Sequence, residues 1–313
     1  MQKVFWISAI FVGVVLGNVY ASAAELGTLA SDNFTIAAAI PAPGYCDDRD
    51  NSRLEESFRR SEMEFNRWYE EYRRAPSGSF EEQRARRMCD EEMRRMNDLF
   101  FYEQEVMWTS TATLERLTTN SYERYRYAPA GSLLETYYRT AMQGFSRGFQ
   151  RKQENVFACA IQYEALNFFE SVAQRHYDAY RYAAAGSLIE AFYRESAQRA
   201  FRYGERKVIE MRRDYRVDFN TFDRMFMDYY NRYRYAAAGS LIEGYFRNVM
   251  TSSGEGSKEL LRARGYQMGR YELQRILDEN NARYRSAPAG SYLERYADEL
   301  RRLAASILDQ VPN

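Results

Sequence analysis

Residues 122–135 read YERYRYAPAGSLLE, and variants of this segment occur five times along the chain. The other copies are residues 69–82 (YEEYRRAPSGSFEE), 177–190 (YDAYRYAAAGSLIE), 230–243 (YNRYRYAAAGSLIE) and 281–294 (NARYRSAPAGSYLE). Their glycines stand at positions 78, 131, 186, 239 and 290, which gives a period of about 53 residues. So regular a period predicts the duplication of one structural unit.

Each copy has the residue types of a corner between two helices. An arginine stands in the expected last helical turn, where its charge complements the negative end of the helix dipole. The glycine permits the left-handed conformation that stops a helix, and in three copies a proline two residues earlier forbids continuation. The next serine and the glutamate three residues after it form a capping box that starts a second helix. The segment therefore predicts an αα-hairpin with a connection of two to four residues.

A helix running through a whole repeat of about 53 residues would be about 80 Å long, so we expect breaks within each repeat. Candidate breaks are Gly144 and Gly148, Gly204, residues 251–257 (TSSGEGS), residues 109–111 and the cap Asn220. No sustained alternation of apolar and polar residues indicates strands. We expect an all-α tandem helical-repeat array, either an α-solenoid or a bundle of αα-hairpins, with two or three helices per repeat.

The N-terminus has the pattern of a cleaved Sec signal peptide over residues 1–23. Lys3 precedes an uncharged apolar run at residues 4–17, and small residues at 21–23 (ASA) fit signal peptidase. The mature chain is expected to begin at Ala24, with no transmembrane segment left after cleavage. The protein should therefore be periplasmic or secreted.

Residues 24–51 carry few charges and include Pro41 and Pro43, so we expect an extended N-terminal linker. The helical-repeat domain should cover residues 52–313, beginning at a capping box formed by Ser52 and Glu55.

The chain has three cysteines, which allow at most one intramolecular disulfide in an oxidising compartment. Cys159 lies in an apolar stretch that is typical of a buried thiol, whereas Cys46 lies in a loop-like segment. A bridge between Cys46 and Cys89 is therefore a hypothesis.

Charge and residue composition exclude several functions. The 44 basic residues balance 44 acidic ones, so no excess of positive charge favours nucleic acid. The single histidine, His176, excludes sites that need two or three imidazoles. No phosphate-binding, dinucleotide-binding or metal-binding motif is present, so neither a cofactor nor a metal is expected.

The recurring Tyr–Arg pairs admit two interpretations. Helix capping and packing explain them, but tyrosine and arginine are also favoured where proteins bind partners. The candidate partner-binding residues are Tyr72, Arg73, Tyr125, Arg126, Tyr180, Arg181, Tyr233, Arg234, Tyr284 and Arg285.

The favoured function is an exported, non-catalytic interaction or structural scaffold in the cell envelope or extracellular space. Its partner would be a protein, an envelope glycan or another copy of the chain, because duplication multiplies a surface whereas catalysis needs one irregular site. The alternative is a carboxylate-dependent enzyme acting on an envelope glycan. Its candidate is Glu170, which is followed by a serine and preceded by two phenylalanines, although no accompanying lytic-enzyme segment is present.

Overall fold

The computed structural model describes residues 48–50, 52–101, 103–214 and 216–311. They lie within one compact unit. The described residues contain eleven α-helices and one 3₁₀ turn and no strand, which confirms the all-α expectation for this part of the chain. The expected signal peptide and nearly all of the expected linker lie outside the described residues.

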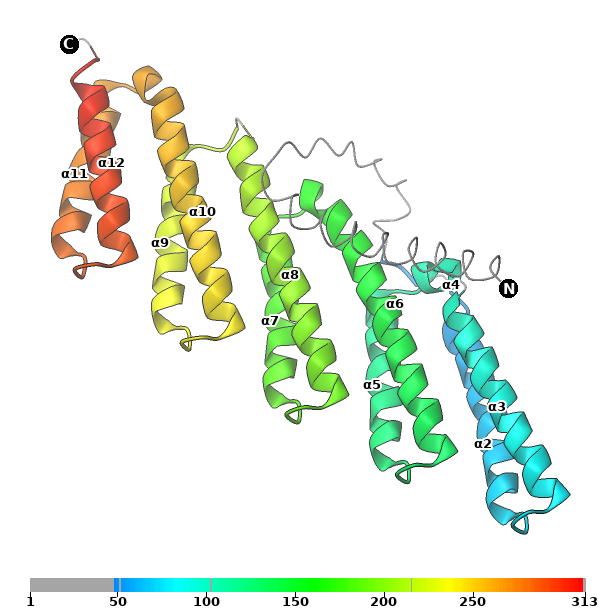
Figure 1. Ribbon diagram of the computed structural model, residues 1–313. Helices are drawn as coiled ribbons and strands as arrows, with labels where there is room; N and C mark the ends of the chain where they lie inside the picture. The colour runs from blue at the N-terminus through cyan, green and yellow to red at the C-terminus, as the bar shows by residue number, and fades with distance from the viewer. Residues whose placement is uncertain (1–47, 51, 102, 215, 312–313) are drawn as a thin grey trace, which may run out of the picture. The chain divides into compact units, whose positions relative to one another are not determined.

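Ten of the helices pack as five adjacent pairs (Figure 1), numbered hairpins 1 to 5 in chain order. Consecutive hairpins contact each other mainly through their second helices. The pairs are α2 (Leu54–Arg74) with α3 (Phe80–Phe101), α5 (Thr111–Tyr127) with α6 (Leu133–Tyr163), α7 (Leu166–Tyr182) with α8 (Leu188–Arg213), α9 (Phe219–Tyr235) with α10 (Leu241–Arg264), and α11 (Arg270–Ser286) with α12 (Tyr292–Leu308). The short helix α4 (Glu103–Trp108) connects hairpins 1 and 2, and the 3₁₀ turn η1 (Gly265–Gln267) precedes α11.

The five corner segments form the predicted helix–glycine–serine–helix corners. Their glycines have φ between 74° and 79°. In hairpin 2, the Ser132 hydroxyl accepts the Glu135 amide at 3.1 Å, and the Glu135 carboxylate accepts the Gly131 amide at 2.5 Å. A standard capping box would return to the serine amide, but here that amide donates to the Pro129 carbonyl at 3.1 Å. The connection is five residues, 128–132, and so is longer than expected.

The corners do not account for where the other helices begin. Ser110 caps α5, as expected for the break at residues 109–111. However, α9 is capped by Asp218 and not by Asn220. The first helix begins after Arg53 without a side-chain cap, because the Ser52 hydroxyl instead accepts from Thr109 at 2.7 Å. The capping box expected at Ser52 is therefore wrong.

The glycine-based breaks are also wrong, because those glycines lie inside continuous helices. Gly144 and Gly148 lie within α6, Gly204 within α8, and residues 251–257 within α10. A Cβ on Gly148 would lie 2.8 Å from a methyl of Val106, and one on Gly256 would lie 2.9 Å from the Phe222 ring. Here glycine permits close approach of packed side chains, and each helix continues past it.

Aromatic side chains join each hairpin to the one before it. The residue two positions after the corner glutamate is buried against an aromatic ring of the preceding hairpin. Tyr137 stacks on Phe65 with ring centroids 4.0 Å apart, and Tyr296 stacks on Phe226 at 3.6 Å. Phe192 and Tyr245 make the equivalent contacts in hairpins 3 and 4. In hairpin 1 the same position is Arg84, which is exposed.

The state of Cys89 disagrees with the hypothesis of a Cys46–Cys89 bridge. Cys89 is a free thiol buried in α3, and desolvation, reinforced by nearby Asp90, raises its pKa to about 12. Cys159, expected as a buried thiol, is disulfide-bonded. Cys46 lies outside the described residues. Cys89 belongs to the buried apolar cluster that contains Phe65 and Met96.

Candidate interaction surface

In four of the five predicted Tyr–Arg pairs, the tyrosine and the arginine differ in their exposure to solvent. The tyrosines at positions 72, 125, 180 and 233 are half-buried, and only Tyr284 is classed as exposed. The five arginines are all exposed. In the three middle hairpins the arginine lies about 6 Å from the ring of the buried tyrosine that begins the corner segment, a cation–π distance. The tyrosines therefore serve packing, and the guanidinium groups face solvent.

Three tyrosines that sequence reasoning missed lie beside these arginines. Tyr127, Tyr182 and Tyr235 are 79%, 89% and 83% exposed. They are the last residues of α5, α7 and α9, at the corner end of their hairpins. Figure 1 shows that the corners of all five hairpins lie at the same end of the helix pairs. In the sequence, each of them is the second tyrosine of a Tyr-Arg-Tyr triplet, and this triplet could have identified them. Hairpins 1 and 5 have arginine and serine at the same position.

The corner arginines of these three hairpins have no acidic partner. Within the described ranges, no carboxylate lies within ion-pair distance of Arg126, Arg181 or Arg234. We call these arginines together with the three exposed tyrosines the corner row. Each hairpin of the row presents one phenol and one uncompensated guanidinium to solvent, a pairing that is enriched at protein interfaces.

Acidic side chains pair with arginines from one hairpin to the next. Each carboxylate stands seven residues before its corner segment on the first helix, and its arginine lies on the first helix of the following hairpin. We call this set the carboxylate–arginine ladder. Its pairs are Glu62 with Arg124, Glu115 with Arg175 (3.0 Å), Glu170 with Arg232 (3.1 Å), and Asp223 with Arg283 (2.6 Å).

Glu170, the candidate for a catalytic carboxyl, belongs to this ladder. Its Oε1 accepts the Tyr229 hydroxyl at 2.6 Å and the Arg232 guanidinium at 3.1 Å. The two donors come from α9, so Glu170 connects hairpin 3 to hairpin 4. Its position along the helix matches that of Glu115 and Asp223 in their hairpins. Its contacts are therefore those of a repeated inter-hairpin pair.

The single histidine belongs to the same ladder. His176 is buried, with its Nε2 3.5 Å from the Glu115 carboxylate and its ring edge-on to Phe149. Burial would raise the pKa of Glu115, but the hydrogen bond and charge of His176, together with the charge of Arg175, outweigh it and lower that pKa. The histidine thus supports the contact between hairpins 2 and 3.

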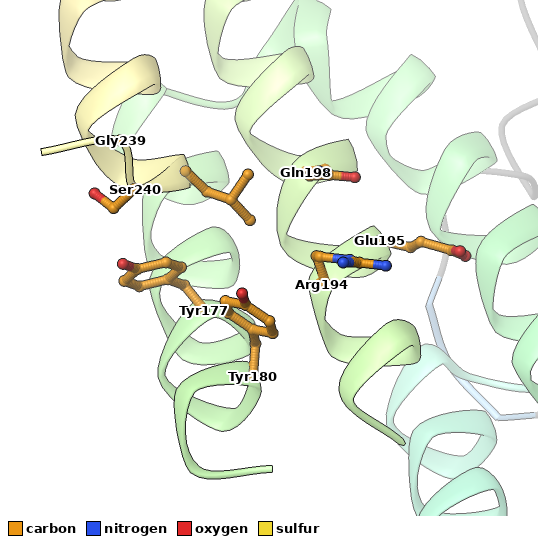
Figure 2. A pocket seen from close by; sticks show the side chains of 8 residues that line it. Tyr177, Tyr180, Arg194, Glu195, Gln198, Gly239 and Ser240 are labelled. Carbon is orange, nitrogen blue, oxygen red and sulfur yellow. The ribbon is translucent and has the colours of Figure 1, made fainter. Parts of the chain in front are cut away.

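A pocket of about 460 Å³ lies between hairpins 3 and 4. As Figure 2 shows, α7 contributes Tyr177 and Tyr180, α8 contributes Arg194 and Gln198, and Ser240 of the hairpin 4 corner lies on the other side. Leu241, the first residue of α10, also lines the pocket. Tyr180 was predicted as a binding residue, and the α8 residues were not. The pocket arises because the corner of one hairpin faces the side of its neighbour, which a repeat pattern does not reveal.

In the described part of the chain, no group of three His, Cys, Asp or Glu side chains could hold a metal ion. None of the described helices has the length and apolar character needed to cross a membrane. No protein-family model, characterised protein or solved structure matches the chain.

Proposed function

We propose that this protein is an exported, non-catalytic scaffold in the cell envelope or extracellular space that binds a partner through its corner row. Its five hairpins would be copies of one unit that recurs about every 53 residues, arranged as an α-solenoid. The observation that carries the proposal is the corner row itself. Three consecutive hairpins expose the same tyrosine, at 79% to 89%, beside the same unpaired arginine.

Exposure on this scale needs a cause other than packing. The corner segments already contain the glycine, serine and glutamate that make each turn, and hairpins 1 and 5 form the same turn without the exposed tyrosine. The aromatic residue is thus unnecessary for the corner. Tyrosine and arginine supply large contact area and directed hydrogen bonds at binding hot spots. Partner binding is therefore the better explanation for their presence.

The ladder supports the same proposal, because it holds neighbouring hairpins at a fixed spacing. Charge-assisted pairs between consecutive first helices restrain each hairpin relative to the next. A row of side chains on such a frame binds with less loss of conformational freedom than a row on mobile segments. Export rests on the sequence of residues 1–23.

The proposal is tested by a pull-down from separate envelope and medium fractions, with the chain from Ala24 as bait. A triple variant, Tyr127→Ala with Tyr182→Ala and Tyr235→Ala, should lose a partner that the unchanged protein retains. The control replaces three other exposed tyrosines that lie outside the corner segments, namely Tyr163, Tyr266 and Tyr271. Equal retention of the partner by the two triple variants would refute the corner row as the binding surface.

The alternative remains a carboxylate-dependent enzyme acting on an envelope glycan, favoured by the partly buried carboxyl of Glu170. Glu170→Gln distinguishes the two functions. For a scaffold, it should weaken the contact between hairpins 3 and 4 and change no glycan. For an enzyme, it should abolish glycan cleavage by the purified protein, and the uncleaved glycan should remain bound. Cleavage by the unchanged protein that Glu170→Gln abolishes would replace the scaffold proposal.

A further inference from the structure

The pocket between hairpins 3 and 4 contains an arginine without an acidic partner. Throughout the ranges that the structure describes, no carboxylate lies within ion-pair distance of Arg194. Glu190, one turn earlier, directs one oxygen to the Gly186 amide at 2.5 Å. Glu195, which also lines the pocket, accepts from Gln150 of α6 at 2.6 Å. Each of these carboxylates thus gives one oxygen to another group, and neither lies within ion-pair distance of Arg194.

The corresponding arginine of hairpin 2 has a different environment. Arg139 stands eight residues after its corner glycine, as Arg194 does. It pairs with Glu135, one turn earlier, and lies over the Tyr125 ring at 5.2 Å from the centroid. Arg139 is therefore compensated within its own hairpin. The same position holds Arg86 in hairpin 1 and Arg247 in hairpin 4, which also have no acidic partner among the described residues, so Arg194 is distinguished by its place in the pocket.

The one charged side chain of the pocket that has no partner among the described residues, Arg194, is a donor, and several of its neighbours can also donate. Arg194 offers five N–H groups and Gln198 an amide, and the hydroxyls of Tyr177 and Tyr180 make no hydrogen bond to another described residue. The one carboxylate, Glu195, already accepts a hydrogen bond from the Gln150 amide through Oε2. A ligand that offers only acceptors satisfies such a pocket, and a carboxylate is that ligand. Arg181 adds positive charge nearby, because it lies over the Tyr177 ring.

We propose that this pocket binds a glutamate or aspartate side chain of an acidic peptide segment. This inference rests on the proposed scaffold function, of which the segment's protein would be a partner. The guanidinium of Arg194 would hold the carboxylate through paired hydrogen bonds. Leu241 and the tyrosine rings give the apolar wall against which the methylenes and backbone of a peptide pack. A volume of about 460 Å³ exceeds one carboxylate and leaves room for the adjoining backbone.

A neutral glycan suits this pocket less well. Each sugar hydroxyl both donates and accepts, and the donated protons need acceptors. The Oε2 of Glu195 already accepts from Gln150, and Leu241 offers no acceptor. Hydroxyls facing these walls would lose their bonds to water without replacement, which is costly.

The test uses the full mature chain and a fluorescein-labelled peptide of alternating glutamate and leucine, followed by fluorescence anisotropy. Saturable binding is expected. Arg194→Gln should weaken it about tenfold, because a charge-assisted pair is lost. Arg139→Gln is the matched control and should change affinity by less than about twofold. A peptide with glutamine in place of glutamate should compete at least about tenfold less well. Far-UV circular dichroism checks that each variant stays helical.

Three results would overturn the inference. The first is no saturable binding of the acidic peptide, and the second is equal affinity for Arg194→Gln and the unchanged chain. The third is tighter binding of an oligogalacturonate than of the peptide, which would assign the pocket to an acidic glycan. The corner-row triple variant should keep peptide affinity within about twofold, because its tyrosines do not line the pocket. Failure of the corner row and failure of the pocket are therefore separate results.

Discussion

Removing one charge from the ladder at Asp223 should destabilise hairpins 4 and 5 strongly. Asp223 is buried in α9, and its two oxygens accept from the Arg283 guanidinium of α11 at 2.6 and 2.8 Å. The first oxygen also accepts the Tyr296 hydroxyl of α12 at 2.9 Å. Asp223→Asn keeps the size of the side chain, loses its charge and replaces one acceptor with a donor.

The size of the effect follows from burial. The side chains of Asp223 and Arg283 are 10% and 22% exposed, so little water replaces the lost bonds. Breaking a buried ion pair by removing one partner costs about 3 to 5 kcal/mol, because the other charge remains desolvated and unpaired. Arg283 keeps Glu279 of its own helix at 4.0 Å, a contact that offsets part of the loss. We therefore expect Asp223→Asn to lower the free energy of unfolding by about 3 kcal/mol.

The measurement combines urea unfolding, followed by far-UV circular dichroism, with hydrogen exchange resolved by segment. Exchange should accelerate in α9, α11 and α12, and hairpin 1 should keep its protection, because each hairpin of a repeat array depends mainly on its neighbours. Asp298→Asn is the matched control. Asp298 pairs only with arginines of its own helix, so its loss should cost less than about 1 kcal/mol.

Equal destabilisation by Asp223→Asn and Asp298→Asn would refute the reasoning, because burial and the inter-hairpin partner would then contribute nothing. A double-mutant cycle with Arg283→Gln isolates the pair itself. A coupling energy below about 0.5 kcal/mol would show that the two side chains act independently, contrary to the geometry.

Three further outcomes follow from the structure. In α10, Gly244→Ala should raise the free energy of unfolding by about 0.5 to 1 kcal/mol, because a Cβ there meets nothing within 4 Å among the described residues. In the same helix, Gly256→Ala should lower the free energy of unfolding by about 1 to 3 kcal/mol, because its Cβ would overpack at 2.9 Å from a phenylalanine ring. Urea unfolding of the two variants side by side checks the opposite signs. On non-reducing gels, Cys159→Ser should abolish the mobility shift caused by reduction and Cys89→Ser should keep it; the reverse pattern would restore the original pairing hypothesis. The folded-state pKa of Glu115 is lowered, so its stabilisation is complete above about pH 4.3 and is lost as the pH falls through the folded value. Urea unfolding between about pH 6 and pH 3 should therefore show a smaller acid-induced loss for Glu115→Gln than for the unchanged chain, and identical pH profiles would contradict this account.

The corners could be predicted from the sequence because every interaction in them is local. The glycine, the capping serine and the glutamate lie within five residues, and each residue type has one role there. The positive φ and the serine cap followed directly from those residue types. Two details differed: Glu135 accepts a different amide, because the serine amide bonds to the turn's own carbonyl, and the connection is longer than expected.

The inner glycines were misread because glycine has two structural roles. In a sequence, Gly148 and Gly256 have the features of helix breakers, and residues 251–257 resemble a flexible loop. In the structure a neighbouring side chain fills the space where each Cβ would be. Those neighbours, Val106 and Phe222, stand more than thirty residues away in the chain. The local pattern could not distinguish a break from a close contact.

The ladder was hidden for a related reason. Its partners stand about sixty residues apart, and the arginine does not keep one position in every repeat. In hairpin 3 the residue that aligns with Arg124 and Arg232 is Ala179, and Arg175, one turn earlier, makes the pair. A position-by-position comparison of the repeats therefore misses the ladder arginine of hairpin 3, Arg175. The carboxylates alone recur in register, and helix faces rich in glutamate are too common to single them out.

The balance of charges has a different meaning once the pairs are located. The whole chain carries equal numbers of basic and acidic residues, which argued against a strongly anionic partner. The ladder uses its carboxylates within the array, where they face arginines of the next hairpin. Arg181 and Arg194, near the corners of hairpin 3, are left without such a partner in the region described. A chain with no net charge can thus present local positive charge. Binding of one acidic peptide side chain needs only one or two guanidinium groups and no extended basic surface, so this local charge is enough for it.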